Sequence, residues 1–120
     1  RIGKDLWSAY DLYYENSPLF FVPNVKTPVL IMHNDKDGAV PWYQGIEFFT
    51  ALRRCGQIAW LLQYNNEEHN LTERRNAKDL SVRLAQFFDH YLKGAPMPKW
   101  MKEGRPATEK GFDLGYEIAE

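Results

Sequence analysis

Hydrophobic residues are spaced along this chain in two ways, and each spacing predicts a different kind of element. Mostly apolar runs of strand length occur at residues 28–33 and 58–64. Apolar side chains instead recur every three or four residues over 41–55 and from Thr72 to Lys93, which is typical of amphipathic helices. Two buried strands joined by a helix predict a βαβ unit with a parallel sheet, so the expected fold class is α/β.

Residues with strong capping preferences mark the ends of these two helices. Pro41 suits the first turn of the helix over 41–55, and Gly56 suits the position just beyond its end. Thr72 is expected to cap the long helix with its hydroxyl, and Gly94 is expected to stop it. The sequence thus places both helices between well-marked boundaries.

The segment before the first strand predicts two shorter helices. Tyrosines and a leucine at helical spacing predict an amphipathic helix over residues 4–15, with its aromatic side packed against a neighbouring layer. Ser17 suits an N-cap and Pro18 suits a first turn, so a short helix is expected over 19–22.

Residues 95–120 form a tail of different composition. Helix- and strand-breaking residues recur through it: Pro96, Pro98, Gly104, Pro106, Gly111 and Gly115. They exclude long regular elements. Trp100 and the other aromatic residues are costly to leave in water, so the tail is expected to run over the surface with its aromatics docked. The predicted division is an α/β part over residues 1–94 and an irregular tail over 95–120.

Composition and charge narrow the possible classes. A chain of 120 residues with 44% hydrophobic content supports one modest core. Lys and Arg (15) nearly balance Asp and Glu (16), which gives no electrostatic reason to expect nucleic acid or an anionic membrane as a partner. A single cysteine, Cys55, excludes an internal disulfide and leaves the compartment undetermined. No apolar run could span a bilayer, and no signal peptide is present. Because the chain starts at Arg1, we expect it to be a piece of a larger protein.

Both predicted strands end in polar loops, which are the candidate functional segments. In open α/β sheets, reactive groups lie just beyond the carboxyl ends of the strands. The first loop offers Asp35 and Asp37, and the second offers Glu67, Glu68 and His69. Asp37 and His69 are 32 residues apart (69 − 37), a natural length for a helix and a strand. A carboxylate bonded to an imidazole fixes its tautomer and supports its cation, as the acid–base half of a nucleophilic triad requires.

The run from Lys26-Thr27-Pro28 through His33 and Asp37 to Pro41 resembles the carboxyl-terminal part of prolyl oligopeptidase family serine peptidases. In that family a strand ending in His is followed, four residues later, by the catalytic Asp. The catalytic His follows a short acidic loop after the next strand. Over about residues 17–93, the resemblance implies the carboxyl-terminal portion of an α/β-hydrolase sheet, with Asp37 and His69 as catalytic residues.

This sequence also departs from the family pattern. Asn34 and Asn70 stand where the family usually has Gly, and Gly38 stands where it often has a second Asp or Asn. No Gly-x-Ser-x-Gly elbow and no His-Gly-Gly segment occurs in the 120 residues. The resemblance therefore implies a parent peptidase for short peptides whose Asp and His lie here, and a chain that is inert alone.

Two other classes of function remain open at this stage. An esterase or acyl hydrolase of the same fold would use the same pair. A stand-alone flavodoxin-like module would use the acidic loop for a metal or phosphate, but such modules have about five strands. A metal site from His33, Asp35, Asp37 and His69 lacks a paired-His helix or a Cys cluster, so neither a metal nor a cofactor is predicted.

The strand at 28–33 also predicts a property of the isolated chain. Its outer edge presents unpaired backbone groups flanked by apolar side chains, with no charge or bulge to block pairing. We therefore expect the chain to self-associate as a homo-oligomer, with this strand or the first helix at the contact.

Overall fold

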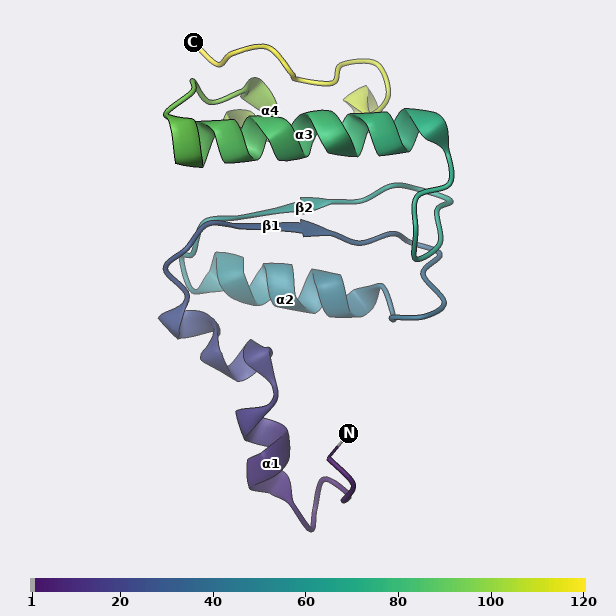
Figure 1. Cartoon of the computed structure of the whole chain (residues 1–120), viewed down its shortest axis with the longest axis vertical. Helices are drawn as coiled ribbons and strands as arrows, with labels where there is room; N and C mark the ends of the chain where they lie inside the picture. The colour runs from purple at the N-terminus through teal and green to yellow at the C-terminus, as the bar shows by residue number, and fades with distance from the viewer. Residues whose placement is uncertain (1) are drawn as a thin grey trace.

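Two short parallel strands form the centre of the fold. The computed structural model describes residues 2–120, and β1 (Val29–Met32) pairs with β2 (Ala59–Leu62) in the register Val29↔Ala59 to Met32↔Leu62. Helix α2 (Tyr43–Arg54) lies on one face of the sheet and α3 (Arg74–Lys93) on the other (Figure 1). The predicted βαβ unit and the α/β fold class are confirmed.

Side chains of the two strands alternate between two hydrophobic clusters, one on each face of the sheet. The cluster on the α2 face contains Val22, Leu52 and Ala59, packed with residues that include Val29 and Ile31. The cluster on the α3 face contains Phe87, Trp100 and Met101, packed with residues that include Leu30, Trp60 and Leu62. This period of two is the geometry of a strand covered on both faces.

Both faces of β1 are covered, as predicted, but the strand itself is not fully buried. Its first three residues are half-buried and Met32 is 36% exposed, although both faces are covered. Within residues 2–120, β1 pairs with β2 alone, so its outer edge stays open to solvent. The expected self-association through this edge stays a prediction.

Helix α2 ends where the sequence predicts and begins slightly later. It starts at Tyr43, two residues after Pro41, and the preceding residues form a turn. Cys55 occupies the C-cap and Gly56 follows with φ of +72°, a left-handed conformation that glycine adopts without strain. The prediction for Gly56 is confirmed.

Helix α3 ends as predicted, but its amino terminus is capped differently. Gly94 adopts φ of +70° and stops the helix, as expected. Glu73 rather than Thr72 occupies the N-cap position, and its side chain makes no capping bond. The Thr72 hydroxyl instead donates to the Glu67 carboxylate at 3.0 Å, so the prediction for Thr72 is wrong.

The first helix is shorter than predicted, because α1 spans only Tyr10–Glu15. The carboxylate of Asp5 accepts hydrogen bonds from the backbone N–H (2.9 Å) and hydroxyl (2.7 Å) of Ser8. These local side-chain bonds stabilise a turn in place of the first helical turn. None of the residues of α1 is buried, and the helix extends away from the sheet (Figure 1), so the predicted packing against a layer is wrong here. Tyr14 stacks on Phe20 instead.

The second short helix, η1, is a 3₁₀ helix over Pro18–Asn24. Ser17 stands at its N-cap position but makes no side-chain capping bond. Its hydroxyl donates to the carbonyl of Tyr13 at 2.6 Å. Carbonyls in the last turn of a helix lack partners within the helix, so Ser17 completes α1 rather than capping η1. The predicted capping role of Ser17 is wrong.

The tail packs against α3 and contains α4 (Lys99–Glu103) and η2 (Ala107–Glu109). The indole N–H of Trp100 donates to Gln86 at 2.7 Å, and Trp100 is 3% exposed. Phe112, by contrast, is 93% exposed, so the expectation of docked aromatics fails there. The division between residues 94 and 95 stays a prediction.

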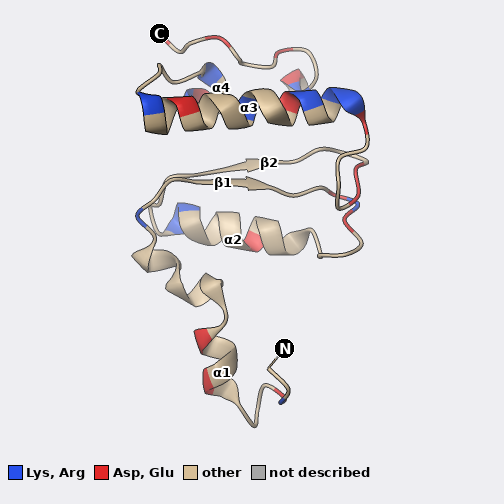
Figure 2. Ribbon diagram, viewed as in Figure 1, with Lys and Arg blue, Asp and Glu red and all other residues tan. Residues whose placement is uncertain are grey.

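Both basic residues (Lys and Arg) and Asp residues occur along α3 (Figure 2). In the part of the chain that the structure describes, no helix is long and apolar enough to cross a membrane.

Candidate active site

The loops that follow the two strands meet at one end of the sheet. Asp37 lies between β1 and α2, and His69 lies between β2 and α3 (Figure 1). His69 Nδ1 is 2.8 Å from Asp37 Oδ2. The structure therefore brings together the two predicted site residues, which are 32 positions apart in the sequence.

Backbone groups of its own loop hold the Asp37 carboxylate in place. Oδ1 accepts the N–H of Ala39 at 2.9 Å and that of Val40 at 2.8 Å, and the side chain is only 4% exposed. The bond from Val40, followed by the bonds from His69 and Ala39, lowers the pKa of Asp37 to about 2. Asp37 is thus a fixed negative charge at neutral pH.

The His69 imidazole is oriented by Asp37 but remains open to solvent, with 55% of its side chain exposed. Its Nδ1 faces an ionised carboxylate oxygen, so Nδ1 carries the hydrogen and donates it. In the neutral ring this leaves an unshared electron pair on Nε2, the form that a general base requires.

Side chains of the first loop also hold the second loop in position. The buried Asn34 amide donates to the carbonyl of Glu68 at 2.8 Å, directly before His69. Asp35 Oδ1 accepts the N–H of Asn66 at 2.8 Å, where Asn66 adopts φ of +66°. Asp35 thus shapes the loop that carries His69.

A buried glutamate fixes the other end of the His69 loop. Glu67 is 1% exposed and accepts the N–H groups of Thr72 (2.8 Å) and Glu73 (3.0 Å) and the amide of Asn76 (2.8 Å). These bonds, led by the one from Thr72, lower the pKa of Glu67 to about 2. Glu67 thus holds the two residues that precede α3, and it also accepts the Thr72 hydroxyl that was expected to cap the helix. The sequence feature that could have indicated this role is an acidic residue shortly before the start of a predicted helix.

Acid is expected to destabilise this loop through Glu67. Because its pKa falls from 4.5 to about 2 on folding, Glu67 stabilises the fold fully above pH 4.5 and progressively less as the pH falls toward 2. In thermal melts followed by circular dichroism, the melting temperature of the wild type should therefore fall more steeply between pH 4.5 and 2 than that of Glu67→Gln. Glu68→Gln, at an exposed neighbour, is the matched control. Parallel curves for the wild type and Glu67→Gln would contradict this role.

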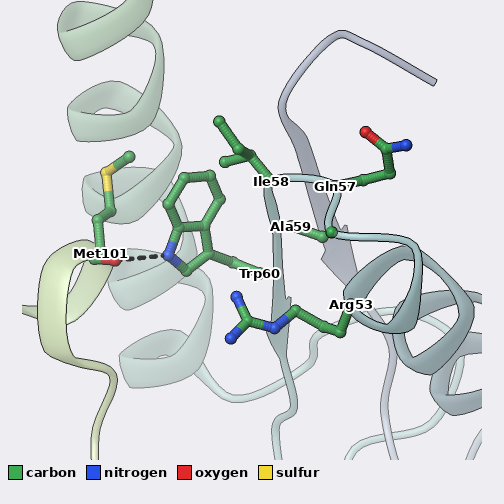
Figure 3. Close-up of a pocket in the computed structure, with 7 residues that line it drawn as sticks. Arg53, Gln57, Ile58, Ala59, Trp60 and Met101 are labelled. Carbon is green, nitrogen blue, oxygen red and sulfur yellow. Dashed lines mark hydrogen bonds between the residues drawn. The ribbon is translucent and has the colours of Figure 1, made fainter.

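A surface hollow of ≈ 340 Å³ lies at the opposite end of the sheet. It adjoins the amino end of β2 and is lined by residues that include Arg53, Trp60 and Met101. Figure 3 shows the indole N–H of Trp60 hydrogen-bonded to the Met101 carbonyl. The hollow is therefore remote from Asp37 and His69. Over residues 2–120, no group of three or more His, Cys, Asp or Glu side chains is arranged to hold a metal ion.

A parallel sheet between two helices, with an acid–imidazole pair beyond its strand ends, is an α/β-hydrolase arrangement. The fold is similar to that of Pyrococcus horikoshii acylaminoacyl peptidase, with a TM-score of 0.65 and 27% identity; the match covers 85% of this chain and 15% of that one. The class is therefore an α/β-hydrolase. The family model of the prolyl oligopeptidase family matches residues 3–95, and the chain belongs to this family of serine peptidases.

Curated relatives agree with this assignment. The chain is 31% identical over 95 residues to the uncharacterized peptidase YuxL of Bacillus subtilis (strain 168), covering 77% of this chain and 14% of that protein. It is 41% identical over 66 residues to the acylamino-acid-releasing enzyme of Rattus norvegicus, covering 55% of this chain and 9% of that enzyme. The chain thus spans only a small part of the length of the relatives it matches.

Proposed function

We propose that this chain supplies the Asp and the His of a Ser-His-Asp triad in a serine peptidase. The observation that carries the proposal is the 2.8 Å bond between Asp37 Oδ2 and His69 Nδ1, which leaves Nε2 of an exposed ring free. Membership of the prolyl oligopeptidase family supports it. The serine would come from a segment outside these 120 residues.

The geometry supports a defined role for each residue. His69 Nε2 would take the proton of the serine hydroxyl as the oxygen attacks the substrate carbonyl. The negative charge of Asp37 would stabilise the resulting imidazolium and hold the ring in place. His69 would then give the proton to the leaving amine.

The proposed substrate is the peptide bond of a short peptide. Relatives named as peptidases and as acylamino-acid-releasing enzymes favour a peptide over the ester of the alternative hydrolase. Family membership also disfavours a stand-alone flavodoxin-like module. The restriction to short peptides rests on the family resemblance, in which a propeller domain commonly screens the site.

The 120-residue chain alone is expected to be inert toward a serine-hydrolase phosphonate probe. No Gly-x-Ser-x-Gly elbow is present, so no hydroxyl is presented to His69. The hydroxyls of Ser8, Ser17 and Ser81 all donate to nearby oxygens of their own segments. Mass spectrometry after incubation should show no stoichiometric adduct.

The controls for this experiment are Ser17→Ala and Ser81→Ala, with a denatured sample as a measure of background labelling. Stoichiometric labelling that disappears in either variant would overturn the proposal, because the chain would then hold its own nucleophile.

A further inference from the structure

We propose that His33 is a positioning residue for the Asp37–His69 pair, an inference that rests on the proposed function. His33 directly follows β1, and its backbone N–H continues the sheet by donating to the Leu62 carbonyl at 3.0 Å. Its side chain is 11% exposed. His33 Nε2 lies 3.3 Å from Asp37 Oδ2, the oxygen that His69 Nδ1 also contacts, and 3.1 Å from the Val40 carbonyl oxygen.

The surroundings of His33 determine where its hydrogen lies. Both oxygens near Nε2, from the Asp37 carboxylate and the Val40 carbonyl, are acceptors. Nε2 must therefore carry a hydrogen, which it donates to the Val40 carbonyl while Asp37 Oδ2 lies beside it at 3.3 Å. In its neutral form His33 is the Nε2–H tautomer, the opposite of the Nδ1–H tautomer that Asp37 imposes on His69.

This contact places a second imidazole beside the Asp37 carboxylate. Oδ1 accepts two backbone N–H groups, from Ala39 and Val40, while Oδ2 faces the two imidazoles of His33 and His69. Four N–H groups thus surround the carboxylate, and three of them, from Ala39, Val40 and His69, are hydrogen-bonded to it. Rotating the carboxylate away from His69 would break several bonds together.

His33 also fixes the loop that carries Asp37. Val40 donates its N–H to Asp37 Oδ1, and its carbonyl accepts from His33 Nε2. Two hydrogen bonds and the 3.3 Å contact between His33 Nε2 and Asp37 Oδ2 thus connect the three residues, starting from the end of β1. The direction of the carboxylate is set by the sheet through His33, and not by the loop alone.

Helix α2 holds the His33 ring from the other side. A Cβ at Gly45, in the first turn of α2, would lie 2.4 Å from His33 Nδ1 and 2.9 Å from His33 Cβ. Only glycine allows the helix to approach so closely. The ring is therefore confined between α2 and the Asp37 loop.

The inference is tested on the 120-residue chain by nitrogen-15 NMR of its histidine side chains, which reports the tautomer of each ring. We expect the Nε2–H form for His33 and the Nδ1–H form for His69. Finding His33 as Nδ1–H would overturn its positioning role and leave the proposed function standing. Finding His69 without the Nδ1–H form would overturn the proposed function together with this inference.

Two variants separate positioning from packing. His33→Leu fills the space of the ring with an apolar side chain and removes the N–H donor. It should shift His69 from the Nδ1–H form toward the Nε2–H form. His33→Gln retains an N–H donor near the Nε2 position and should restore the wild-type signals of His69. Gly45→Ala should act like His33→Leu by displacing the ring. Unchanged His69 signals in His33→Leu, with a dispersed amide spectrum showing that the chain is folded, would overturn the proposal.

Discussion

Replacing His69 with alanine is expected to lower kcat by roughly 10⁶-fold in an active peptidase that carries this segment. The imidazole both accepts the proton of the nucleophile and returns it to the leaving group, so its removal abolishes both proton transfers. Steady-state kinetics on a short peptide substrate measures this effect.

The matched control is His90→Ala, because His90 is also an imidazole that bonds through Nδ1. Its partner is the Ala95 carbonyl at 2.8 Å, near the end of α3 and away from the strand-end loops. This variant should leave kcat nearly unchanged. Comparable losses in both variants, or a loss below about tenfold in His69→Ala, would contradict the assigned role.

The second large effect is expected from Asp37→Asn, which should lower kcat by roughly 10⁴-fold in the same enzyme. An amide nitrogen at the position of Oδ2 donates a hydrogen bond to His69 Nδ1, whereas the carboxylate oxygen accepts one. The ring then carries its hydrogen on Nε2, and the electron pair needed for proton transfer no longer faces the serine. The measurement is kcat across neutral pH.

Asp35→Asn is the control for this prediction. Asp35 accepts one backbone N–H, from Asn66, and the carbonyl oxygen of an asparagine accepts the same bond. Its kcat should therefore change far less than that of Asp37→Asn. A severe loss at position 35 with little effect at position 37 would show that the wrong carboxylate had been assigned.

The pattern of apolar residues was sufficient to predict the central elements of the fold. The runs at 28–33 and 58–64 contain β1 and β2, and helical spacing correctly located α2 and α3. Gly94 ends its helix as expected, because only a glycine adopts the left-handed conformation there at no cost. These features depend on local backbone preferences and on which side chains avoid water, and both are properties of short stretches of sequence.

Features that depend on local competition between polar groups were predicted less well. The sequence showed Thr72 as a capping residue, but it could not show that the Glu67 carboxylate would accept the Thr72 hydroxyl and the N–H groups of Thr72 and Glu73 just before the helix. Likewise, Asp5 bonds to Ser8 and prevents the first turn of the predicted helix. In each case two acceptors compete for one donor, and their distances in the folded chain determine which hydrogen bond forms.

The sequence by itself determined that Asp37 and His69 would follow neighbouring parallel strands, because a helix and a strand separate them and the strand ends of a βαβ unit lie side by side. Only the tertiary structure decided how the pair is held. The bond from Asn34 to the His69 loop depends on strand register, and the contact of His33 with Asp37 depends on how the segment after β1 folds back. Register fixes which side chains of separate segments come within about 3 Å of each other, the distance at which hydrogen bonds form. Spacing along the chain does not specify this distance.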